Sequence, residues 1–214
     1  MRWVGIQNNL ATCLRDQGKL DEAEGYFRAV VHDLQPDAPS PALAGAMGNL
    51  AKCLVKKGEL DEAHTLLKSA VAMKREVLRP DDRRLAISLH DLGGLHLQRG
   101  APAEAEPLLR EALKIRRARF TDQGWRTAAT GSVLGDCLLQ LDRLDEAAVL
   151  LRQSYPVLDA EDPAAETTQR ALQKLIDVYE RLGQSEQAAA LRVKLPTEQD
   201  PVASDPPAEG KQEE

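Results

Sequence analysis

Histidine and cysteine are the residue types in this chain that would bind a metal ion or carry nucleophilic chemistry. The 214 residues include four histidines and three cysteines. A helical metal site places two ligands four residues apart, so that both side chains lie on one face. No two histidines have this spacing, and none lies beside a group of cysteines. The histidines are His32, His64, His90 and His96. The sequence therefore predicts no metal site and no cofactor.

The three cysteines share one position in a recurring pattern. Cys13, Cys53 and Cys137 each come two residues after a small side chain in a segment with helical periodicity. Equivalent positions of stacked repeats lie about 10 Å apart, which is too far for a disulfide bond. We expect all three to be small buried side chains without a redox or metal role. An odd number of cysteines also fits a reducing compartment.

Acidic and basic side chains are abundant, but their positions favour structural roles. Three Asp-Glu pairs stand where predicted helices begin, and carboxylates there complement the positive end of the helix dipole. These pairs occupy residues 21–22, 61–62 and 145–146. A basic run falls in the last turns of another predicted helix, where we expect a solvated face. It consists of Lys114, Arg116, Arg117 and Arg119. With no convergent catalytic set, the chain is predicted not to be an enzyme.

A repeat of 40 to 42 residues organises most of the chain. A motif that begins with Gly18-Lys19-Leu20-Asp21-Glu22-Ala23 recurs four times further along. Ahead of each copy, apolar residues recur at positions i, i+1 and i+4, which places them on one face of a helix. Each unit is therefore predicted to contain a first helix (helix A), a turn marked by glycine, and a second helix (helix B). Asp142 replaces the glycine in the fourth unit, where we expect modest strain or a different cap.

Small side chains are expected to let the two helices of each unit approach closely. Helix A carries an alanine or glycine at its centre in four units, and helix B begins with an alanine. Pairs of large apolar residues, such as 66–67, 108–109 and 150–151, then fill the core between units. Pro107 falls in the first turns of its helix, where a missing amide costs little, whereas Pro156 is expected to end or kink its helix. Only 3% of the residues are aromatic, which fits such an all-α core.

These units resemble the tetratricopeptide repeat, which has a small residue, a glycine, an alanine and large apolar residues at matching positions. The period exceeds the 34 residues of the common form and is similar to the 42-residue repeats of kinesin light chains and many bacterial proteins. The resemblance implies an all-α solenoid of five helix-turn-helix units in a right-handed superhelix. The expected array spans residues 1–195, with units at approximately 1–36, 37–79, 80–120, 121–159 and 160–195.

The last two units also resemble the C-terminal repeats that follow the catalytic domain of bacterial serine/threonine protein kinases. The similar segments are residues 125–128, 132–138 and 150–156. The chain itself has no glycine-rich phosphate loop, no His-Arg-Asp segment and no Asp-Phe-Gly segment. The resemblance therefore implies a regulatory or docking region and no kinase activity in this chain.

The concave side of such a superhelix is lined by helix A of each unit. Positions three and two before the small residue, and one and four after it, project inward. Asparagine suits an extended peptide because it offers two donors and an acceptor, while a merely solvated surface is the alternative for each residue. The expected partner-binding residues are Asn8, Asn9, Thr12, Arg15, Asn49, Lys52, His90, Asp91, Ser132 and Asp136.

A clamp for a C-terminal carboxylate is not expected on this face. Related chaperone cofactors form that clamp with Lys or Asn, then Asn, then Lys or Arg on three consecutive A helices. At the matching positions of this chain only Asn49 agrees, and Asp91 reverses the charge.

The net charge of −6 comes mostly from the C-terminal segment. Residues 196–214 carry six acidic side chains, one lysine and four prolines, and we expect a disordered acidic tail. The remaining, nearly neutral body lacks the basic stripe with stacking rings that a nucleic-acid groove needs. No apolar run approaches the roughly 20 residues that span a bilayer, and no signal pattern is present. We expect a cytoplasmic protein that binds neither nucleic acid nor membrane.

The function expected from these features is a non-enzymatic scaffold that binds a protein or peptide segment in its concave groove. It would serve as the regulatory or docking region of a bacterial kinase. The alternative is a structural module that self-associates end to end through its terminal helices. The first helix begins almost at Met1 without a polar capping repeat ahead of it, which suggests either a longer chain or an edge covered by a partner.

Overall fold

The computed structural model describes residues 2–35, 39–119 and 124–195, and this part of the chain folds into ten helices joined by short turns. The helices are α1 (Arg2–Asp16), α2 (Leu20–Leu34), α3 (Pro41–Lys57), α4 (Leu60–Val77), α5 (Arg83–Gln98), α6 (Pro102–Arg119), α7 (Trp125–Gln140), α8 (Leu144–Glu161), α9 (Glu166–Arg181) and α10 (Ser185–Arg192). Helices α1, α3, α5 and α7 each pack most extensively on the even-numbered helix that follows, whereas α9 packs on both α8 and α10 and more extensively on α8. The protein is thus the all-α solenoid of five helix pairs that was predicted. The predicted acidic tail at 196–214 lies outside the described residues.

A left-handed residue ends helix A in every unit, because it lets the chain reverse direction within a few residues. The glycines at this place are Gly18, Gly58, Gly100 and Gly183, with φ between +72° and +84°. Asp142 takes the same place in the fourth unit with φ +61°. A left-handed backbone costs a residue other than glycine about 1 kcal/mol. The fourth unit therefore forms the same turn, with the modest backbone strain at Asp142 that its sequence predicted.

Close approach of the two helices within a unit depends on small residues. A Cβ atom on Gly93 would lie 2.7 Å from Cγ of Leu109, and one on Gly135 would lie 2.6 Å from Cγ of Leu151. Both distances are too short for real carbon atoms, so glycine is required where these helices touch. The expected packing of small residues against leucines is confirmed in these units.

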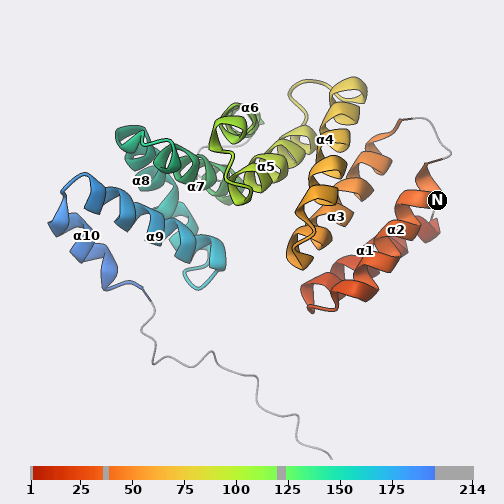
Figure 1. Cartoon of the computed structure of the whole chain (residues 1–214), viewed down its shortest axis with the longest axis horizontal. Coiled ribbons are helices and arrows are strands. Elements are labelled where there is room, and N and C mark those ends of the chain that lie inside the picture. Colours follow the sequence, from red (N-terminus) through yellow and green to blue (C-terminus); the bar gives the residue numbers. More distant parts are fainter. Residues whose placement is uncertain (1, 36–38, 120–123, 196–214) are drawn as a thin grey trace, which may run out of the picture.

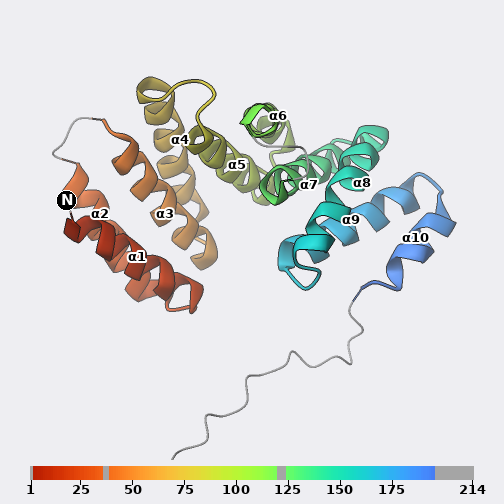
Figure 2. The ribbon, with the colours of Figure 1, turned by 180° about the vertical axis from the view of Figure 1, so that it is seen from behind.

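The five pairs form a curved array, with the odd-numbered helices α3, α5, α7 and α9 on the inner side of the arch (Figure 1). The even-numbered helices α4, α6 and α8 lie on the outer side, as the view from behind also shows (Figure 2). Successive odd-numbered helices touch one another directly. The inner face is therefore a continuous surface made almost entirely by helix A of each unit.

The apolar core consists of two clusters that meet in the third unit. One extends from Ala11 in α1 to Ile115 in α6, and the other extends from Ala105 in α6 to Ala188 in α10. Buried polar side chains lie near this junction, among them Ser88, Arg116 and Thr130. The middle of the arch thus differs in chemistry from both ends.

Two expectations from the sequence need correction. Helix α8 runs past Pro156 to Glu161, so this proline does not end the helix, and the kink that was the other expectation stays a prediction. Cys13 is exposed, whereas Cys53 and Cys137 are buried as predicted. The thiols of the two buried cysteines donate to backbone carbonyls in helix B of the preceding unit. Cys13 lies in α1, and no helix B precedes it within the described residues.

Candidate functional site

Asparagine side chains join the first two units on the inner face. The Asn49 amide of α3 donates a hydrogen bond of 2.9 Å to the Asn8 side-chain oxygen of α1. The Thr12 hydroxyl donates to the backbone carbonyl of Asn8, also at 2.9 Å. All three side chains are half-buried. The structure therefore brings these three predicted residues together, with further donors and acceptors of the two amides left for a ligand.

Ion pairs join later units at one shared register. Lys52 Nζ of α3 lies 2.9 Å from Asp91 Oδ2 of α5. Asp136 Oδ1 of α7 lies 3.3 Å from Lys174 Nζ of α9. The first residue of each pair comes one position after the central small residue of its helix, which is Ala51 or Gly135. The second residue comes two positions before the equivalent residue of the next A helix, which is Gly93 or Ile176. Lys174 is not among the residues predicted to bind a partner. It stands at the same repeat position as Asp91, and that position could have identified it.

The other predicted residues of units one and four are not joined in this way. Arg15 pairs with its neighbour Asp16 at 2.8 Å, and Asn9 is exposed. Ser132 was expected to project into the groove but is buried. Its register is that of Asn8 and His90, whose side chains contact the next A helix. The same direction points Ser132 toward α9, which packs against α7.

His90 occupies the centre of the inner face, on α5. Its Nδ1 atom lies 3.3 Å from the Thr130 hydroxyl of α7. Loss of solvent lowers the pKa of His90 to about 4; Asp91 opposes this shift, and Arg116 and Lys52 add to it. The ring is therefore neutral near pH 7, so it acts as a hydrogen-bonding group and not as a cation.

Two buried cations lie behind the inner face in a repeated arrangement. Lys74 of α4 donates to the Ser88 hydroxyl at 2.7 Å and to the Arg84 carbonyl at 3.2 Å. Arg116 of α6 donates to the hydroxyl of Thr130 and the carbonyl of Arg126, which stand at the same spacings along the chain. The two cations are only 5% and 7% exposed.

The burial of Arg116 corrects the prediction that the basic run in α6 forms a solvated face. Desolvation lowers the pKa values of both Lys74 and Arg116, and Asp91 is the leading influence that opposes it. The signal for these residues was present in the sequence, because each stands eleven positions after the alanine that begins its helix. Units one and four carry leucine at this register, as Leu34 and Leu158.

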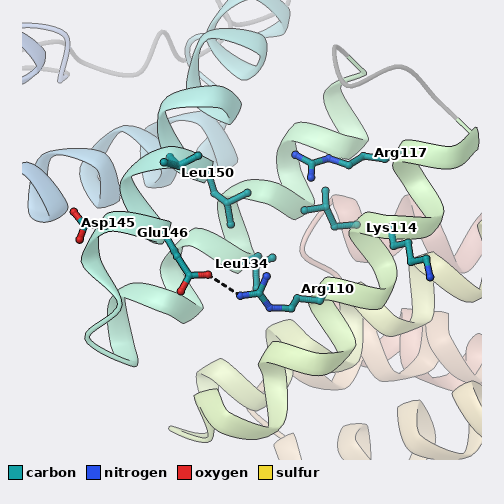
Figure 3. A pocket seen from close by; sticks show the side chains of 9 residues that line it. Arg110, Lys114, Arg117, Leu134, Asp145, Glu146 and Leu150 are labelled. Atoms are coloured by element: carbon teal, nitrogen blue, oxygen red, sulfur yellow. Dashed lines mark hydrogen bonds and ion pairs between the residues drawn. The ribbon is translucent and has the colours of Figure 1, made fainter.

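A hollow of about 600 Å³ lies on the outer side of the arch, between helices α6 and α8 (Figure 3). Apolar side chains from three helices line it, including Leu113, Leu134 and Leu150. Arg110 and Glu146 point toward each other across it and lie 3.0 Å apart. This ion pair spans the hollow, so a ligand entering there must pass around it or separate the pair.

The cysteines and the other metal-ligating side chains show no arrangement for redox or metal chemistry in the part of the chain that the structure describes. No group of three or more His, Cys, Asp or Glu side chains in these residues could hold a metal ion. Burial raises the pKa of Cys137 to about 11 and also raises that of Cys53, which leaves both thiols protonated. None of the described helices combines the length and the apolar character needed to cross a bilayer.

Two of the solved structures with this fold match most of this chain. A putative kinesin light chain of Podosopora anserina, with nearly identical TPR-like repeats, superposes with a TM-score of 0.76 at 22% identity. That match covers 89% of this chain and 92% of the other. BtubC (BKLC) from P. vanneervenii gives a TM-score of 0.72 at 20% identity, covering 92% of this chain and 85% of the other. At these identities the likeness shows the fold.

A third similar structure is that of a Rap protein complexed with Competence and Sporulation Factor. Its TM-score is 0.70 at 14% identity, and the match covers 88% of this chain but 51% of the Rap chain. No curated protein matches the sequence significantly. The tetratricopeptide repeat profile matches residues 5–76 and 42–118, and a second profile of the same description matches residues 128–153. The chain belongs to the tetratricopeptide repeat family.

Proposed function

We propose that the protein binds an extended peptide segment of a partner along the inner face of its arch. The observation that carries this proposal is the row of polar contacts between successive A helices. It begins with Asn8 and Asn49, continues through Lys52 and Asp91, and ends at Lys174. Tetratricopeptide repeats mediate protein–protein interaction, and a curved solenoid offers an extended concave surface for that purpose. Such repeat domains are typically non-catalytic.

An extended peptide exposes unpaired backbone amides and carbonyls, and asparagine side chains can bind both. Asn8 and Asn49 use one donor and one acceptor between them in their mutual hydrogen bond. The remaining groups lie on the half-buried inner face, where water competes less strongly for them than in bulk solvent. The pair therefore supplies a fixed, partly desolvated contact for a peptide backbone.

The test uses a displayed library of random twelve-residue peptides selected on the purified chain. We expect the double variant Asn8→Ala/Asn49→Ala to weaken binding of the selected peptides by about tenfold, which corresponds to about 1.4 kcal/mol. The matched control, Thr65→Ala/Ser69→Ala, changes two exposed polar residues of α4 and should leave binding unchanged. If the wild type and the asparagine variant bound the peptides equally well, the proposed binding site on the inner face would be contradicted.

The kinase context belongs to the same proposal. The likeness of residues 125–156 to repeats that follow bacterial kinase domains rests on the sequence alone, and the regulatory or docking role stays a prediction. The coding sequence that precedes residue 1 would test it directly, because a kinase domain encoded there is the expected result under this view.

Self-association is a second candidate, favoured by an apolar stripe on α1. Trp3, Ile6 and Leu10 are 66%, 56% and 43% exposed. In the later units the residues equivalent to Leu10 are buried; they are Leu50, Leu92, Leu134 and Leu175. Helix α10 exposes mainly polar residues, such as Ser185, Gln187 and Arg192, so pairing of α1 with α1 of a second copy buries more apolar surface than stacking of α1 on α10.

Light scattering over a range of protein concentrations tests this second candidate. A dimer that becomes a monomer in the Ile6→Glu variant supports pairing through α1. A wild-type chain that stays monomeric at high concentration argues against it.

A further inference from the structure

The centre of the inner face and the buried layer directly behind it together carry more positive than negative charge. The cluster consists of Lys52, Lys74, His90, Asp91 and Arg116, which we call the central cluster. Three of its members are cations, one is a carboxylate and the histidine is neutral. Asp91 is already in contact with Lys52 at 2.9 Å. Asp82 also acts on Lys74, but the nearby Arg84 and Arg126 add positive charge. Cations therefore outnumber carboxylates around the cluster, which leaves room electrostatically for a further anionic group.

Nothing in the repeat architecture requires charge at the two buried positions. Leu34 and Leu158 occupy the equivalent place in other units and pack as apolar side chains. A buried cation without an ionic partner is costly because it has lost its water. Lys74 and Arg116 have hydroxyl and carbonyl partners but no carboxylate within ion-pair distance among the described residues. A bound anion would supply the missing partner.

Arg116 is only 7% exposed, but its contacts place its charge close to the inner face. Its guanidinium reaches from α6 to Thr130 of α7, and the Thr130 hydroxyl lies 3.3 Å from the His90 ring of α5. The group therefore lies between α5 and α7, two helices that line the inner face (Figure 1). Both hydrogen bonds of Arg116 to Arg126 and Thr130 are donated by Nη1, and Nε and Nη2 donate to no described residue.

We propose that the central cluster binds a carboxylate side chain of the peptide held on the inner face, so that the preferred ligand is an acidic peptide. This inference rests on the peptide-binding function proposed above. Arginine donates two parallel hydrogen bonds to a carboxylate, which makes such pairs stronger and more selective than those to neutral groups. Lys74 adds positive charge on the other side of α5, and the neutral His90 offers a hydrogen bond without a further charge.

This site differs from a clamp for a C-terminal carboxylate. The two buried cations come from B helices and reach inward between the A helices, whereas the clamp uses residues on the A helices themselves. The central position of the cluster also allows an extended chain to continue past it in both directions. We therefore assign the carboxylate to a Glu or Asp side chain, and the terminal carboxylate becomes an alternative that the experiment separates.

The test compares Arg116→Leu with the wild type in the same random-peptide selection. Leucine is the residue that two other units carry at this register, so the variant is expected to fold. Peptides selected on the wild type should be enriched in Asp and Glu, and those selected on the variant should not. The matched control is Arg152→Leu, which removes an exposed arginine of α8 and should keep the acidic preference.

A double-mutant cycle then locates the contact. Replacing the critical Glu of a selected peptide by Gln should weaken binding to the wild type about tenfold and binding to Arg116→Leu less than twofold. Amidating the peptide C-terminus should have little effect on either protein. The assignment is overturned if the Glu-to-Gln change costs both proteins the same, or if amidation alone reproduces the loss.

These results also separate the inference from the proposed function. Selected peptides that depend on Asn8 and Asn49 but show no acidic preference would leave peptide binding on the inner face in place and remove the carboxylate site. A protein that selects no peptide at all would contradict both. The Arg116→Lys variant keeps the charge but not the planar donor pair, and its binding should fall between those of the wild type and Arg116→Leu.

Discussion

The ammonium group of Lys52 lies 2.9 Å from the carboxylate of Asp91, and this ion pair joins α3 to α5 on the inner face. The corresponding pair between α7 and α9 has its charges exchanged, with Asp136 on the earlier helix and Lys174 on the later one. Either polarity therefore fits this register. What distinguishes Asp91 is that its charge also acts on the two buried cations of the central cluster.

Exchanging the charges of the two pairs should consequently have different effects on stability. The free energy of unfolding of the Asp136→Lys/Lys174→Asp variant should stay within about 0.5 kcal/mol of the wild-type value. A partly exposed ion pair contributes little, and the exchanged side chains can form the same pair again. The Lys52→Asp/Asp91→Lys variant should lose about 1–3 kcal/mol, since it removes the acid that acts most strongly on the buried cations. Urea denaturation measures both. Equal stability of the two variants would contradict the special role of Asp91.

The buried cation Arg116 should contribute little to folding. Replacing a buried charge by a leucine of suitable shape is commonly neutral or stabilising, so Arg116→Leu should change the free energy of unfolding by less than about 1 kcal/mol. Thermal and urea unfolding measure this change. A loss greater than about 3 kcal/mol would mean that the guanidinium holds α6 and α7 together. The presence of an arginine at this position would then be explained by stability alone, without a bound ligand.

His90 should make the protein less stable in acid. Its folded pKa of about 4 lies below the value of about 6.5 expected when the chain is unfolded. Between these values the unfolded state binds a proton that the folded state does not, so stability falls as the pH drops from 6.5 toward 4. The wild type should lose about 2 kcal/mol more than His90→Gln over this range. If the stability of the two proteins changed in parallel with pH, the lowered pKa of His90 would be contradicted.

Gly135 should tolerate no side chain, unlike Gly94. A Cβ on Gly135 would lie 2.6 Å from Leu151, whereas one on Gly94 would meet nothing within 4 Å. Gly135→Ala should therefore destabilise the protein by about 1–3 kcal/mol through overpacking, and Gly94→Ala should stabilise it by up to about 1 kcal/mol through helix propensity. Differential scanning calorimetry gives both changes. A stabilised Gly135→Ala variant would show that α7 and α8 can separate without cost.

The helix pairs could be predicted because their determinants are local. The left-handed glycine, the alanine that begins helix B and the small residue of helix A lie within about 15 residues of one another and recur in register. The exposure of Cys13 could not be predicted in this way. Whether that position is buried depends on the helix that precedes it in space, which the pattern of the unit itself does not contain.

The polar residues were harder to place than the apolar ones. A charge on a helix is normally solvated, so the basic run around Arg116 predicted an exposed face. The structure buries Arg116 because the helix B position it occupies faces the next helix A. Comparison of Lys74 with Arg116, and of Ser88 with Thr130, would have revealed the recurring contact. Such pairs become visible only when the units are aligned with one another.

The most direct test of the account is to locate a selected peptide on the protein by nuclear magnetic resonance. Peptide should be added to the isotopically labelled chain, and changes in the backbone amide signals should be mapped onto the helices. Binding on the inner face predicts the largest changes around Asn49, Asp91 and Asp136. Changes confined to the outer hollow around Arg110 and Glu146 would contradict it.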